Sequence, residues 1–294
     1  MLLLLLAVGY SAMGLTYQRQ IHPIAEQGLP RREGWQREFG MGLALGWGVA
    51  IVCVIPMILM GGLAIALSGR SAMWTWLLAD AAFFLVLTLV EEVVFRGFGF
   101  QCLMRAAGPL AATLVYSLFY AVVQMMVPGA SSVSFAVAFL LALLLSTAYL
   151  RTRALWVGWG INFAWKGSRA LLFGLIVSGV GSHSSVVEST PMGPTSLTGG
   201  YFGLDGTWVA FLILLAAFPV LVRITRDLDF VHNAPVIIPG GYPVDLDAQA
   251  RAQHEAAMGP AAVPLVQIGP ATPAADQPPV VLPGFPEPPA PPKA

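Results

Sequence analysis

Long apolar runs alternate with short polar segments along the first 222 residues of the chain. About 20 helical residues cross a hydrocarbon core about 30 Å thick, and seven runs match or approach that length. They are residues 1–17, 39–67, 73–95, 107–127, 133–150, 154–178 and 207–222. The pattern predicts an all-α, polytopic membrane helix bundle with about seven transmembrane helices.

The first run begins at Met1, without the basic region and small-residue cleavage site of a secretory signal peptide. We therefore expect an uncleaved span, followed by a cytoplasmic loop, in an N-terminal unit of residues 1–38. The other six runs form a helix bundle over residues 39–225.

The end of the chain differs sharply in composition, because 15 of the 23 prolines fall in the final 64 residues. Proline lacks an amide donor and interrupts helices, and such segments stay extended and solvated. We expect a disordered tail over residues 226–294. It is either a ligand for a proline-recognition domain or a spacer without a dedicated partner.

Composition agrees with a membrane protein. Hydrophobic residues make up 57% of the 294 positions and charged residues 10%, against about 25% charged in a soluble domain. Net charge is zero and the basic residues are scattered, which excludes a nucleic-acid-binding protein. The two cysteines, Cys53 and Cys102, lie in or beside apolar runs without the spacing of a metal site.

The arginines near the ends of the runs predict an orientation, because basic residues in short loops stay in the cytoplasm. On one side the loops carry Arg19, Arg31, Arg32, Arg37, Arg96, Arg105, Arg151, Arg153, Arg223 and Arg226. The opposite side carries only Arg70. This asymmetry predicts an N-terminus outside and a cytoplasmic C-terminal tail.

One group of charges lies at the end of the third run, in Glu91-Glu92-x-x-x-Arg96-Gly97. Ionisable side chains at membrane depth are costly and often functional. Glu92 and Arg96 are one helical turn apart, close enough to pair, while Glu91 points about 100° around the helix. The group is either an ion pair that marks the end of a helix or part of a catalytic site.

This segment resembles the first signature of the CPBP membrane proteases, which include CAAX prenyl protease 2, lysostaphin resistance protein A-like proteins and bacteriocin-processing or immunity homologues of the ABI family. Ser117–Gln124 stands where the family has an aromatic residue followed four positions later by histidine. Asn162-Phe163-Ala164-Trp165-Lys166 is similar to its third signature, His-x-x-Trp-Asn. Residues 173–203 resemble a stretch common in bacterial members.

The resemblance implies an endopeptidase of the bacterial cytoplasmic membrane that cleaves a membrane-associated peptide or a prenylated protein. In the family, a glutamate and two histidines surround a catalytic water or a divalent metal such as zinc. Here Gln124 and Asn162 replace the histidines, and Lys166 replaces the asparagine. Side-chain amides are not ordinary zinc ligands, so we expect no metal and no other cofactor.

Lys166 has two interpretations. It could neutralise Glu91 or Glu92 at the old active site, because two buried glutamates repel each other without a nearby cation. Alternatively it extends toward a lipid headgroup beside Arg169. The candidate site residues are Glu91, Glu92, Arg96, Gln124, Asn162 and Lys166.

Two functions follow from these residues. The first is a weak membrane endopeptidase in which a glutamate activates water and Gln124 and Asn162 stabilise an oxyanion. The second is a non-catalytic pseudoprotease that binds a membrane peptide or partner, acts as a scaffold or confers immunity. The substituted histidines favour lost activity, and the four histidines present, His22, His183, His232 and His254, lie outside the predicted spans. A transporter has less support, since the halves show no internal repeat.

Overall fold

The computed structural model describes residues 2–17, 25, 27–67, 73–177, 184–233 and 254–255. The chain divides into two units, Met1–Ala234 and Pro235–Ala294. Nearly all of the predicted proline-rich tail therefore lies outside the described residues. The fold described below is that of the first unit.

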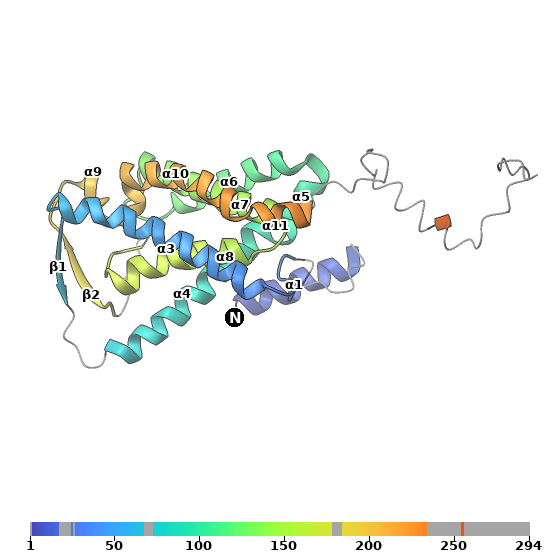
Figure 1. Ribbon diagram of the computed structural model, residues 1–294, viewed down its shortest axis with the longest axis horizontal. Helices are drawn as coiled ribbons and strands as arrows, with labels where there is room; N and C mark the ends of the chain where they lie inside the picture. The colour runs from blue at the N-terminus through green and yellow to red at the C-terminus, as the bar shows by residue number, and fades with distance from the viewer. Residues whose placement is uncertain are drawn as a thin grey trace, which may run out of the picture. The chain divides into compact units, whose positions relative to one another are not determined.

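Helices make up most of the first unit (Figure 1). They are α1 (Leu2–Tyr17), α3 (Trp35–Leu59), α4 (Met73–Arg96), α5 (Phe98–Ala107), α6 (Pro109–Gln124), α7 (Ser132–Thr152), α8 (Trp156–Gly167), α9 (Thr195–Thr198), α10 (Trp208–Ile224) and α11 (Arg226–Asn233). A π-helical turn, Ser168–Leu172, continues α8, and a 3-10 helix, Gly200–Gly206, precedes α10. A helix lies in each of the seven predicted runs.

Two of the described helices, α3 and α7, are long and apolar enough to cross a membrane. The bent pair of α10 and α11 would make a third span if the two helices act as one. The structure thus agrees with the mostly helical membrane fold that the sequence predicted, but it does not confirm the number of seven spans.

Two short strands were missed by the sequence prediction. β1 (Leu63–Leu67) pairs antiparallel with β2 (Val187–Pro191), with Leu63 opposite Pro191 and Leu67 opposite Val187. β1 was predicted as the end of the 39–67 span, and β2 lies between the predicted spans 154–178 and 207–222. A short apolar run has no periodicity that separates a strand from a helix, so the distant partner decides the conformation.

The bundle also extends further along the chain than predicted. Residues 226–233, assigned to the tail, form α11, and Asp229 pairs with Arg151 of α7 at 2.9 Å. The Asn233 side chain donates to the carbonyl oxygens of Leu150 and Arg151. Because these contacts tie α11 to the end of α7, the predicted boundary at residue 225 is wrong by eight residues.

The largest apolar core joins α3, α7, α8 and α10, and glycines bring α3 and α8 together within it. A Cβ atom added to Gly42 would lie 2.1 Å from the Val157 carbonyl oxygen. One added to Gly160 would lie 2.3 Å from the Phe39 carbonyl oxygen. Small residues allow membrane helices to approach closely, so these glycines set the distance between α3 and α8.

Replacing Gly42 with alanine is expected to lower the free energy of unfolding by about 1–3 kcal/mol, the usual cost of overpacking a core. Gly48→Ala is the matched control, because a Cβ atom at Gly48 meets nothing within 4 Å. The melting temperatures of both variants are measured by thermal unfolding in detergent. Equal melting temperatures for the two variants would contradict the close approach of α3 and α8 at Gly42.

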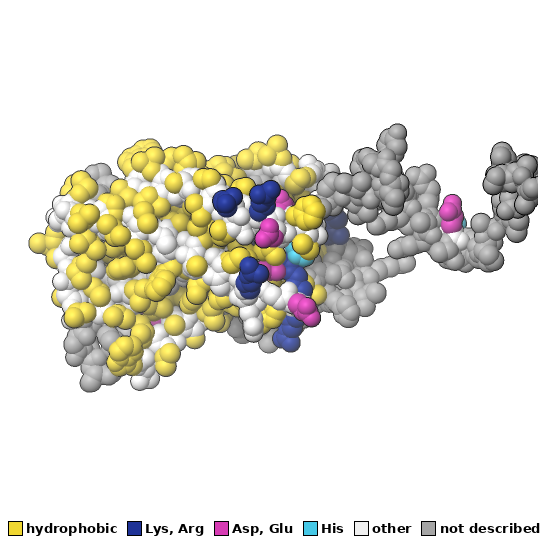
Figure 2. Space-filling model, viewed as in Figure 1, with side chains coloured by type: hydrophobic (Ala, Val, Ile, Leu, Met, Phe, Trp, Pro, Cys, Tyr) yellow, Lys and Arg dark blue, Asp and Glu magenta, His cyan; other side chains and the backbone are white. Residues whose placement is uncertain are grey.

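The face of the molecule shown in Figure 2 is largely apolar. Large side chains such as Trp74, Leu78, Leu110 and Met126 are between 63% and 82% exposed. On the face shown in Figure 2 the charged side chains gather toward one end, near α11. Apolar side chains exposed over so much of a helix bundle are suited to lipid rather than water, in agreement with an integral membrane protein.

Candidate functional site

The last turn of α4 carries a buried ion pair. Arg96 Nη1 donates to Glu92 Oε1 at 3.2 Å, and both side chains are 1% exposed. Arg96 Nη2 also donates to the carbonyl oxygen of Ala142 on α7 at 3.1 Å. The ion pair that the four-residue spacing predicted is confirmed. Through the Ala142 carbonyl oxygen, Arg96 also fixes α4 against α7.

One face of α8 lies against this acidic pair. Gly158, Asn162 and Lys166 are spaced by four residues and so share that face. Asn162 Nδ2 donates to Glu91 Oε2 at 3.0 Å and to Glu92 Oε1 at 3.1 Å. A Cβ atom at position 158 would lie 2.9 Å from Glu92 Oε2, so glycine leaves room for the carboxylate.

Lys166 pairs with Glu91. Its Nζ atom lies 2.5 Å from Glu91 Oε1, and the side chains of Lys166 and Glu91 are 5% and 18% exposed. Lys166 therefore forms the ion pair with Glu91 and does not extend toward a lipid headgroup, which was the alternative interpretation of the sequence. Two carboxylates and two cations balance within the site, which is the condition for keeping charges buried.

Gln124 stands apart from the carboxylates. Its Nε2 atom donates to the Tyr120 hydroxyl at 3.1 Å, and no hydrogen bond among the described residues joins it to Glu91 or Glu92. The buried Tyr120 ring lies 5.7 Å from Arg96 Cζ and 5.9 Å from Lys166 Nζ, within the range of cation–π attraction. Sequence reasoning assigned Tyr120 no role, although it lies one turn before Gln124.

Of the six candidate residues, five are thus in direct contact: Glu91, Glu92, Arg96, Asn162 and Lys166. Among the described residues, Gln124 is linked to them through Tyr120. No group of three or more His, Cys, Asp or Glu side chains that could hold a metal occurs within the described parts of the chain. His22 and His183 lie outside the described residues, and His232 belongs to α11.

A second buried charge cluster follows one turn later and was missed from sequence. Arg169 is fully buried in the π-helical turn, with its Nη1 atom 2.9 Å from Asp205 Oδ1. Its Cζ atom lies 4.1 Å from the centre of the Trp165 ring, and Trp165 Nε1 donates to Asp205 Oδ1 at 3.0 Å. The available signal was an arginine inside the apolar run 154–178, since such residues usually have buried partners.

The fold and the site together define a class: an integral membrane helix bundle with a charge-balanced polar site buried between its helices. Residues 71–168, which include all six candidate residues, match the Rce1-like family of type II CAAX prenyl endopeptidases. The match covers one third of the chain and bears out the resemblance to the CAAX protease family that its motifs indicated. The stretch 173–203 lies beyond the match. Comparisons with curated proteins and with solved structures find no match.

Proposed function

We propose that this chain is a catalytically degenerate member of the CAAX protease family, a pseudoprotease of the membrane. The observation that carries the proposal is the contact between Lys166 and Glu91. A general base must be free to accept a proton from water. Here both Glu91 oxygens already accept a donor, because the Lys166 ammonium group binds Oε1 and the Asn162 amide binds Oε2.

Glu92 is no better suited to this role. Both the Arg96 guanidinium and the Asn162 amide donate to Glu92 Oε1, while Oε2 is buried against Gly158 with no hydrogen-bond partner among the described residues. The whole residue is fully buried, which keeps water from reaching it. General acid–base help contributes about 10²–10⁴-fold to a rate. With both Glu91 oxygens bound by donors, Glu92 fully buried and no imidazole among the site residues, we expect this contribution to be lost.

The residues at the site also do not fit a divalent metal. The donors that remain are two carboxylates and two side-chain amides, whereas zinc sites in proteins use imidazole, thiolate and carboxylate. The Lys166 ammonium group stands against the Glu91 carboxylate that would bind the metal. We therefore derive no metal-dependent step for this chain.

The ion pairs give the two glutamates a use without catalysis, because they link α4 to α7 and to α8. A family member that keeps its bundle after losing its chemistry can still bind what its relatives bind. We propose that the chain binds a membrane-associated peptide or protein, as a scaffold or an immunity protein. Function depends on the site rather than on the fold, so the partner has to be found by experiment.

We also propose a topology for the bundle in a bacterial cytoplasmic membrane. Its seven spans are α1, α3, α4, α6, α7, α8 with its π-helical turn, and α10. The N-terminus lies outside the membrane. This orientation rests on the arginine asymmetry of the loops. It leaves the proline-rich tail in the cytoplasm.

The test restores the family's residues with Gln124→His, Asn162→His and Lys166→Asn together and incubates both proteins with a membrane-peptide library. We expect cleavage and about one bound zinc per chain for the restored protein, and neither for the natural chain. The restored protein carrying Glu91→Ala is the control for site-dependent cleavage. Cleavage by the natural chain that disappears in Glu91→Ala or Glu92→Ala would overturn the proposal.

A further inference from the structure

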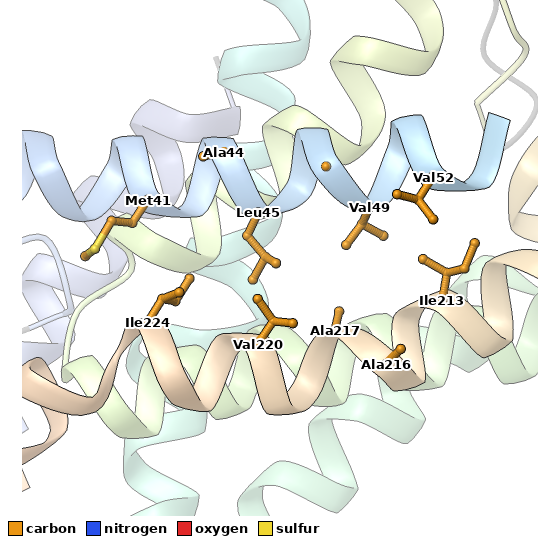
Figure 3. Close-up of a pocket in the computed structure, with 11 residues that line it drawn as sticks. Met41, Ala44, Leu45, Val49, Val52, Ile213, Ala216, Ala217, Val220 and Ile224 are labelled. Carbon is orange, nitrogen blue, oxygen red and sulfur yellow. The ribbon is translucent and has the colours of Figure 1, made fainter. Parts of the chain in front are cut away.

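An apolar groove of about 550 Å³ runs between α3 and α10 (Figure 3). All of its lining residues are apolar, and Leu45 and Val49 of α3 face Ala217 and Val220 of α10. The volume falls within the range of about 300–1,000 Å³ that is typical of small-molecule sites. A groove of this size and lining suits a hydrocarbon chain.

Small residues keep the groove open. Four of the lining residues are small: Ala44 and Gly48 on α3, and Ala216 and Ala217 on α10. A Cβ atom at Gly48 would meet nothing within 4 Å, in contrast to the packed glycines of the same helix that face α8. The hollow is therefore space that no described side chain fills.

Two arginines flank one end of the groove. Arg37 precedes the lining residue Met41 by four positions on α3, and Arg223 follows the lining residue Val220 by three positions on α10. Residues three or four apart share one face of a helix. Both arginines are exposed, and neither makes an ion pair with a residue that the structure describes.

We propose that the groove binds one acyl chain of an anionic phospholipid from the surrounding bilayer, with the phosphate held between Arg37 and Arg223. The apolar lining accommodates the acyl chain, and the guanidinium groups, which prefer phosphate geometry, lie where α3 and α10 reach the headgroup region. An apolar helix from a second copy would fill the groove but leave these two charges without a counterion. The charge pattern therefore favours the lipid.

The experiment is native mass spectrometry of the full-length chain in detergent, titrated with dioleoylphosphatidylglycerol or dioleoylphosphatidylcholine. We expect one retained phosphatidylglycerol, bound about tenfold more tightly than phosphatidylcholine, because basic residues attract anionic headgroups. Arg37→Gln with Arg223→Gln should abolish this preference. Arg105→Gln is its control, an exposed arginine at the end of α5 that is outside the groove.

Gly48→Leu tests the acyl chain separately and should weaken binding of both lipids at least tenfold by filling the groove. Gly9→Leu on α1 is its matched control, since a Cβ atom there also meets nothing within 4 Å. Equal binding of the two lipids by the natural chain, or binding unchanged in Gly48→Leu, would overturn the proposal. A dimer that dissociates in Gly48→Leu without any loss of lipid would assign the groove to a second copy instead.

Discussion

Replacing Lys166 with methionine is expected to lower the free energy of unfolding by about 3–5 kcal/mol, the usual cost of breaking a buried ion pair by removing one partner. The variant keeps Glu91 next to Glu92 but loses the ammonium group that balances it. Thermal and chemical unfolding in detergent measure the loss. Wild-type yield and stability for this variant would rule out a structural role for the pair.

A double variant separates lost charge balance from lost packing. Lys166→Met with Glu91→Leu removes both charges, and replacing a whole buried pair with apolar residues is often neutral or stabilising. We therefore expect the double variant to regain most of the stability lost in Lys166→Met alone. If the two variants were equally unstable, the packing of the lysine side chain and not its charge would be responsible.

Replacing Arg169 with methionine is the second change with a large expected effect, again about 3–5 kcal/mol. Arg169 is fully buried, stacks on Trp165 and pairs with Asp205 at 2.9 Å. The variant leaves the Asp205 carboxylate without the guanidinium beside it. Because Asp205 belongs to the 3-10 helix, we expect the segment 200–206 to detach from α8 before the rest of the bundle unfolds.

Limited proteolysis and hydrogen exchange distinguish that local opening from a general loss of stability. Protection should fall first across residues 200–206 and the π-helical turn, while α4 keeps its protection. Arg105→Met on α5 is the control, since this arginine is exposed. Uniform loss of protection across all helices would mean that Arg169 supports the whole core rather than this one junction.

Lys166 and Arg169 attach the end of α8 to different partners. Lys166 and Arg169 are three residues apart, yet one contacts α4 and the other contacts the 3-10 helix. Lys166 replaces an asparagine of the family signature, whereas Arg169 lies just beyond the matched segment. The change at Lys166 therefore bears on the loss of catalysis, and Arg169 bears on how the end of α8 is attached.

Local spacing predicted part of the site well. The pair of Glu92 and Arg96 followed from their separation of one helical turn. The positions of Asn162 and Lys166 beside the glutamates followed from the family resemblance. Which glutamate pairs with Lys166 could not be predicted, because that depends on how α4 and α8 are rotated against each other. Gln124 has no hydrogen bond to either glutamate among the described residues, because its amide donates to Tyr120 of its own helix.

The amino-acid sequence was sufficient for the membrane class, the place of each long helix and the family resemblance, since apolar length and signature spacing are local properties of the chain. It was not sufficient for β1, for α11 or for the buried pair of Arg169 and Asp205. Each of these depends on partners between 36 and 128 residues away along the chain. Such partners come together only when the helices pack, because hydrogen bonds and ion pairs act over a few ångströms in space and not along the sequence.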